Sequence, residues 1–137
     1  MSENPEIVMQ AKHIVKQFPA SHGRTLTACN DINLTMYKGR TLGIVGESGC
    51  GKSTFVRMVI SLDQPTSGEI LYHGKNITGL SKKETWENRQ NLQMVFQDPL
   101  ASFNPKMKIG DILTEPLMNY KKIKRSERNA KARELLR

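Results

Sequence analysis

Apolar and polar residues alternate in several short stretches of the chain, which is the pattern of half-buried β-strands. Three stretches show it, at residues 7–18, 31–36 and 69–72. In the first, Ile7, Met9 and Ala11 share one face, and we expect an edge strand that runs into a loop at residues 19–24. Glycine-containing turns follow the other two stretches. The N-terminal part of the chain is therefore predicted to form an antiparallel sheet.

Two further short stretches predict strands. Residues 42–45 form an apolar run that predicts a buried strand leading into a glycine-rich turn, and residues 92–96 predict the next strand, which ends at Gln97-Asp98-Pro99. A third apolar stretch, residues 53–62, contains neither glycine nor proline and is long enough to predict a largely buried helix. This order of strand, glycine-rich turn and helix predicts an α/β fold, with the antiparallel sheet beside a second sheet that contains the strand over residues 42–45.

The last third of the chain has helical patterns. Ser81 and Glu84 fit a capping box, which predicts a helix from there to about Asn91. Two further helices are predicted, one over residues 109–120 that Pro116 interrupts, and one that Ser126 caps. We expect two domains, a β subdomain with the phosphate-binding core over residues 1–98 and a helical subdomain that begins over residues 99–137.

The chain has 137 residues and a formal net charge of +8, and the charge is concentrated at its C-terminal end. From Lys121 onward there are eight basic residues against two acidic ones, without aromatic residues between them. That pattern favours a solvated helix face over a nucleic-acid or lipid surface. The N-terminus lacks the features of a signal peptide, so a cytoplasmic location is expected. Cys29 and Cys50 are too far apart in sequence for a C-x-x-C site, and we expect free thiols.

The candidate chemistry lies in residues 46–53, GESGCGKS, which fit the phosphate-binding pattern G-x-x-x-x-G-K-[ST] without a mismatch. The glycines let backbone N–H groups converge on an anion, while Lys52 supplies a positive charge and Ser53 a hydroxyl for Mg²⁺. The alternative is a glycine-rich turn with an incidental Lys-Ser pair. The flanking strand and helix occur in the order that phosphate binding requires, and this favours a nucleotide site.

The phosphate loop alone does not identify the reaction. Hydrolysis needs a second acidic residue for Mg²⁺, and Asp98 is a poor candidate because Gln97 interrupts the apolar run before it and Pro99 follows it. A GTPase would need an Asn-Lys-x-Asp motif, and residues 129–132 have the wrong order. A small-molecule kinase remains open at this point.

Three longer segments resemble the ATPase subunits of ATP-binding-cassette importers for oligopeptides and dipeptides. They are Leu26–Thr54, Thr66–Ile77 and Gln93–Leu117. The third segment is the most specific, because it resembles the Q-loop of that family, QDP-x-x-S-x-NP, through Gln97, Asp98, Pro99, Ser102, Asn104 and Pro105. The resemblance covers nearly the whole chain and makes an unrelated kinase the weakest alternative.

The resemblance implies a site for ATP and Mg²⁺. The implied nucleotide-binding residues are Phe18, Gly46, Glu47, Ser48, Gly49, Cys50, Gly51, Lys52, Ser53 and Thr54. Lys52 would bridge the β- and γ-phosphates, Thr54 would lie near the α-phosphate, and Phe18 would stack on adenine, although a hydrophobic anchor at a strand end explains Phe18 almost as well. Ser53 and Gln97 are the implied Mg²⁺ ligands, and Lys52 and Gln97 the implied catalytic residues.

The same resemblance implies the partners of the chain. These would be the transmembrane permease subunits of a peptide importer and a second ATPase subunit, with the chain on the cytoplasmic face of the membrane and no nucleic acid bound.

The chain departs from the family pattern in what its sequence lacks. The signature LSGGQ, the Walker B Asp-Glu pair and a switch histidine after the Q-loop are absent from the 137 residues. The sequence therefore resembles the N-terminal part of a nucleotide-binding domain, and we expect uncovered apolar strands and little or no ATP hydrolysis by this chain alone. The alternative function is a catalytically inactive nucleotide-binding remnant.

Overall fold

The computed structural model describes residues 5–96, 98, 103–120 and 122–137. The chain divides into two compact units, residues 1–89 and residues 90–137. The domain boundary that the sequence predicts at residue 98 stays a prediction.

The first unit is built on a four-stranded antiparallel sheet in the order β2-β1-β3-β4. Its strands are β1 (Ile7–Pro19), β2 (Thr25–Tyr37), β3 (Ser67–Tyr72) and β4 (Lys75–Asn76), and the short 3₁₀ helix η1 (Ser21–Gly23) joins the first two. The antiparallel sheet is as predicted, but β1 is an interior strand rather than an edge strand. Alternation along one strand shows which face is buried, and it carries no information on how many neighbours the strand has.

A β-bulge shifts the buried face of β1 by one residue. Met9 and Ala11 are buried in alternation, and the next fully buried side chain is Ile14 rather than residue 13. His13 has a φ of 51°, and the pairing with both β2 and β3 changes register around it. An extra residue of this kind reverses the two faces of a strand beyond it. Ile14 therefore joins Met9, Ala11 and Ile70 in the core of the unit.

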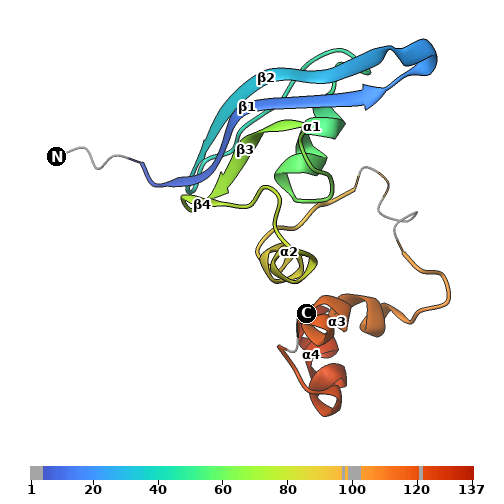
Figure 1. Ribbon diagram of the computed structural model, residues 1–137. Helices are drawn as coiled ribbons and strands as arrows, with labels where there is room; N and C mark the ends of the chain where they lie inside the picture. Colours follow the sequence, from blue (N-terminus) through green and yellow to red (C-terminus); the bar gives the residue numbers. More distant parts are fainter. Residues whose placement is uncertain (1–4, 97, 99–102, 121) are drawn as a thin grey trace. The chain divides into compact units, whose positions relative to one another are not determined.

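One helix of the first unit packs against the sheet, as Figure 1 shows. This helix, α1 (Lys52–Val59), buries Phe55 and Met58 and ends before the predicted limit at residue 62. The strand predicted over residues 42–45 does not form, because these residues pair with no described strand. Val45 is 96% exposed, which confirms that this apolar run is uncovered.

The capping box predicted at Ser81 is confirmed. The Ser81 hydroxyl accepts a hydrogen bond from the Glu84 N–H at 3.3 Å, and the Glu84 carboxylate accepts one from the Ser81 N–H at 3.0 Å. The helix α2 (Lys82–Arg89) follows. Its last residue donates from Nη2 to the Ser61 carbonyl at 2.8 Å, and this bond joins α2 to the end of α1.

The second unit contains the helix α3 (Ile109–Asn119), the 3₁₀ helix η2 (Arg125–Glu127) and the helix α4 (Arg128–Leu135). Arg128 pairs with Asp111 at 3.1 Å between α4 and α3. The strand predicted over residues 92–96 is absent, since these residues join no described strand. The interruption predicted at Pro116 is also wrong, because α3 continues through it.

Ser126 is not the N-cap that the sequence predicts, since it lies inside η2. The Lys124 N–H instead donates to the Glu127 carboxylate at 2.7 Å, one turn before α4 begins. In the described part of the chain, the helices are all too short or too polar to cross a membrane.

Candidate phosphate-binding site

The loop between residue 45 and α1 has the backbone conformation of a phosphate cradle. Gly49 and Gly51 have φ values of +81° and +97°, a backbone conformation that L-residues with a side chain rarely adopt. Gly51 also lies against β2, where an added Cβ would stand 2.2 Å from the Ala28 carbonyl oxygen. The sequence pattern of the loop therefore has a structural reason, since only glycine fits between the loop and the sheet at this position.

Lys52 folds back over this loop. Its ammonium donates to the carbonyl oxygens of Gly46 and Glu47, each at 2.6 Å, and lies 3.5 Å from the Cys50 sulfur. These acceptors hold the positively charged ammonium at the mouth of the loop, where a bound anion would contact it. Phosphate oxygens carry negative charge, so they would bind the ammonium more strongly than these neutral carbonyl oxygens do.

The N-terminus of α1 supplies further donors for an anion. The first hydrogen bond of the helix runs from the Phe55 N–H to the Gly51 carbonyl at 2.9 Å. The N–H groups of Lys52, Ser53 and Thr54 come before it and have no acceptor among the described residues. The positive end of the helix dipole lies at the same place. These donors and the Lys52 ammonium fit a phosphate chain.

A pocket of about 230 Å³ joins this loop to the end of β1. Its lining residues come from β1, β2, the loop and the first turn of α1, namely Phe18, Leu26, Ala28, Gly49, Gly51, Lys52, Ser53 and Thr54. Phe18 thus lies on the wall of the pocket that also holds the predicted phosphate ligands. One pocket thus presents an aromatic side chain and a group of N–H donors that can bind an anion. This combination suits a ligand with a flat ring and a chain of phosphates.

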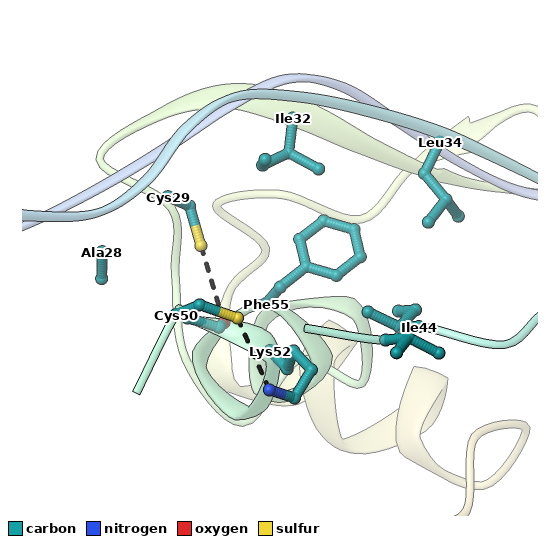
Figure 2. A pocket seen from close by; sticks show the side chains of 10 residues that line it. Ala28, Cys29, Ile32, Leu34, Ile44, Cys50, Lys52 and Phe55 are labelled. Carbon is teal, nitrogen blue, oxygen red and sulfur yellow. Dashed lines mark hydrogen bonds between the residues drawn. The ribbon is translucent and has the colours of Figure 1, made fainter. Parts of the chain in front are cut away.

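The other predicted site residues have different places. Gly46 and Glu47 supply the carbonyls that hold Lys52, and Ser48 is an exposed residue of the loop. Cys50 faces a second pocket on the other side of the loop, which Figure 2 shows. Gln97 lies outside the described residues, so its predicted role stays a prediction.

Lys16 is a residue of the site that the sequence pattern did not identify. Its ammonium lies 5.0 Å from the centre of the Phe18 ring and donates to the Asp63 carboxylate at 2.8 Å and to the Gln64 carbonyl at 2.7 Å. The hydrogen bond from Lys16 lowers the pKa of Asp63. Lys16 and Phe18 are two residues apart on one strand, and that spacing was the available signal.

Leu26 and Ala28 were missed as well. Both line the pocket from β2, where Leu26 pairs with Phe18 across the two strands. The pairing of β2 with β1 is irregular at Ala28, since Lys16 pairs with Cys29 and Gln17 with Thr27, so alternation along the sequence does not predict their place on the pocket.

Among the described residues, no cluster of three His, Cys, Asp or Glu side chains could hold a metal ion. The Ser53 hydroxyl lines the pocket, and a divalent cation here would draw its remaining ligands from phosphate oxygens and water, as Mg²⁺ at nucleotide sites commonly does.

Comparisons with known proteins identify the family of the chain. Residues 29–137 match the family model described as ABC transporter. The oligopeptide transport ATP-binding protein OppF of Haemophilus influenzae is 44% identical over 128 residues, which cover 88% of this chain and 39% of that protein. OppF of Bacillus subtilis is 44% identical over 133 residues, which cover 96% of this chain and 43% of that protein. The chain thus spans about two fifths of the length of these relatives.

Solved structures show the same fold. The dimeric structure of MJ0796, described as a bacterial ABC transporter cassette, superposes with a TM-score of 0.80 at 26% identity, covering 92% of this chain and 54% of that one. A post-hydrolysis structure of the same cassette, bound to ADP and Pi, superposes with a TM-score of 0.78 at 25% identity and the same coverage. The predicted fold class, that of an ABC ATPase with an antiparallel β subdomain, is confirmed.

Proposed function

The chain belongs to the ABC transporter family, and from this premise we propose that it binds ATP with Mg²⁺ as the nucleotide-binding part of a peptide importer. The observation that carries the proposal is the pocket on which Phe18 and the residues of the phosphate loop meet. The names of the most similar relatives, which are oligopeptide transport ATP-binding proteins, support peptides as the transported substrate.

Several residues of the pocket would contact the nucleotide. The N–H groups at the start of α1 donate to phosphate oxygens, and Lys52 leaves the carbonyls of Gly46 and Glu47 to bridge the β- and γ-phosphates. Phe18 stacks on the adenine ring and contributes about 1 kcal/mol. The Thr54 side chain lies at the α-phosphate end.

Mg²⁺ would neutralise charge on the β- and γ-phosphates when it is bound. The Ser53 hydroxyl is the ligand that the described residues offer it, and the predicted second ligand is Gln97. The Ser53 side chain is exposed at the first turn of α1, so it can turn toward the phosphates without disturbing the core.

The partners follow from the proposed transport role. We infer that the chain works on the cytoplasmic face of the membrane with transmembrane permease subunits and a second ATPase subunit. The dimeric cassette among the solved relatives supports the ATPase pair.

Thermal unfolding with and without Mg-ATP tests the nucleotide site. A ligand that binds only the folded state raises Tm, and at 100 times Kd the gain is about 2.7 kcal/mol. We expect Lys52→Ala to abolish this shift and to leave the Tm of the ligand-free chain within about 2 °C, because the hydrogen bonds of the Lys52 ammonium to described residues all stay within its own loop.

The matched control is Lys83→Ala, which removes the same charge from the exposed face of α2 and should keep the full ATP-dependent shift. Equal shifts in the parent and in Lys52→Ala would contradict the phosphate-binding role of Lys52.

A further inference from the structure

Two thiols, one on the phosphate loop and one on β2, line the same pocket. The pocket has a volume of about 210 Å³ and lies between β2, the loop and α1. Cys29 enters it from β2, and Cys50 enters it from the loop (Figure 2). Both are free thiols. Residues 29 and 50 are far apart in sequence, so it is the packing of the loop on β2 that brings the thiols to one pocket.

The two thiols are close enough to affect each other. The Cys29 sulfur lies 3.9 Å from the carbonyl oxygen of Gly51, the residue directly after Cys50. Burial raises the pKa of Cys29, and a negative charge on Cys50 raises it further. Figure 2 shows the Cys29 side chain pointing from β2 toward the loop that carries Cys50.

We propose that Cys29 and Cys50 are a dithiol that a hydroperoxide oxidises to an intramolecular disulfide, and that this disulfide blocks the phosphate site. The blocking step rests on the proposed function, whereas formation of the disulfide does not.

The exposure of each thiol determines which of the two reacts first with the hydroperoxide. Cys50 is exposed and Cys29 is buried, so a hydroperoxide reaches Cys50 first. The Cys50 sulfur attacks one oxygen of hydrogen peroxide, the O–O bond breaks and a sulfenic acid forms, while the released oxygen takes up the thiol proton and leaves as water. The Cys29 sulfur then attacks the sulfenic sulfur, the S–O bond breaks and water leaves. Two thiols lose two electrons in total, and one peroxide becomes two waters.

The disulfide would change the loop at the atoms that bind phosphate. The Cys50 sulfur now lies over Gly46, where an added Cβ would stand only 2.8 Å from it, and it contacts the Lys52 ammonium. A bond to Cys29 moves this sulfur toward β2 and away from both groups. The loop is then tied to the sheet, and its N–H groups lose the common orientation that a phosphate requires.

The first experiment maps the disulfide in the full chain. The reduced protein is treated with hydrogen peroxide, the excess is removed, and the protein is digested without reduction for mass spectrometry. We expect one linked peptide that joins residues 29 and 50. Cys29→Ala should give no linked peptide, and its Cys50 sulfenic acid should accumulate and react with dimedone, whereas the parent should show little dimedone adduct. A parent whose Cys50 is oxidised without the linked peptide would overturn the proposal.

The second experiment measures ATP affinity in the reduced, oxidised and re-reduced parent. We expect the oxidised protein to bind Mg-ATP at least tenfold more weakly and dithiothreitol to restore the affinity. A linked protein that binds as tightly as the reduced one would overturn the blocking step. If the reduced parent does not bind Mg-ATP, the proposed function fails instead, and the peptide map still decides whether the dithiol forms.

Discussion

At the scale of single residues, the phosphate loop is fixed by close packing against β2. Gly51 is the tightest point, because a Cβ there would overlap a backbone carbonyl that cannot move without distorting the strand. Gly74 has a similar φ of +77°, yet nothing lies within 4 Å of the position its Cβ would take. Comparing an alanine substitution at each of the two glycines therefore separates the cost of a left-handed backbone conformation from the cost of steric overlap.

We expect Gly74→Ala to lower the free energy of unfolding by about 1–2 kcal/mol, the usual cost of a left-handed non-glycine residue. Gly51→Ala should lower it by about 3 kcal/mol or more, because the steric overlap adds to that cost. Urea denaturation of the two variants measures both values. A difference of less than about 0.5 kcal/mol between them would show that the loop moves away from β2 without penalty.

A second residue-scale feature is the ion pair of Lys16 and Asp63 beside Phe18. Lys16 donates to Asp63 at 2.8 Å, and this bond lowers the pKa of the Asp63 carboxyl from its ordinary value of 3.8. A lowered pKa in the folded state means that the unfolded chain takes up the proton first as pH falls. The stabilisation is thus complete above about pH 4 and is lost as pH falls through the pKa of the folded state.

This pH dependence is testable with Asp63→Asn. At pH 7 we expect the variant to be less stable than the parent by about 1–2 kcal/mol, because Lys16, whose side chain is only 12% exposed, loses its charged partner. The difference should shrink as pH falls from 4 to 2. Chemical denaturation over this pH range checks it, and a difference that stays constant would exclude the ion pair as its cause.

At the scale of elements, the sequence predicted those structures that local chemistry determines. The capping box at Ser81 follows from hydrogen bonds within four residues, and the glycine pattern of the loop follows from a backbone conformation that other residues avoid. Residues far apart in sequence decide the rest. The interior place of β1 depends on pairing with β3, about 55 residues later, and the run over residues 42–45 found no described strand to pair with.

The residues of the candidate site also fall into those that local sequence predicts and those that depend on distant parts of the chain. The phosphate donors are consecutive residues, and the sequence motif identified them. Leu26 and Ala28 line the pocket, and Lys16 lies over the ring of Phe18, only through strand pairing and packing, so no motif marks them. Gln97 was proposed from the family resemblance alone, and it lies outside the described residues.

The helix α3 forms even though Pro116 predicts an interruption within it. Pro116 is the eighth residue of α3, so the helix has no N–H there to bond the Ile112 carbonyl. The helix continues beyond the proline, where the Tyr120 N–H donates to the Pro116 carbonyl at 3.1 Å. The residues before the proline are held by two side-chain contacts. Thr114 is fully buried and donates to the Gly110 carbonyl at 2.7 Å, and Asp111 binds Arg128 of α4.

Replacing Pro116 by alanine should therefore stabilise α3, by about 1–3 kcal/mol, since it restores the missing hydrogen bond. Native-state hydrogen exchange of the α3 amides measures this locally. Glu115→Ala is the matched control, because it introduces alanine at the neighbouring exposed position without adding an N–H donor. Equal protection in the two variants would mean that the bond does not re-form.

At the scale of the whole molecule, apolar surface remains uncovered in both units. Val45 in the first unit and Val95 in the second are 96% and 90% exposed. Each lies in a run that the sequence predicted as a strand. Extended apolar segments with free backbone groups pair readily with other chains. We therefore expect the chain to self-associate through these runs at high protein concentration.

Val45→Lys tests this expectation without touching the core. A side chain that is almost fully exposed contributes little to the free energy of unfolding, so the Tm should stay within about 2 °C. The added charge should reduce self-association, because a lysine on an exposed extended segment opposes pairing with another copy. Sedimentation velocity over a concentration series measures the change.

The control variant is Gln17→Lys, which adds the same charge at an exposed position of β1, the strand that pairs with β2 on one side and with β3 on the other. It should leave self-association close to that of the parent, since no unpaired apolar run lies at this position. If both variants reduced association equally, net charge alone would explain the effect. A fall confined to Val45→Lys would identify residues 42–45 as the segment through which the copies pair.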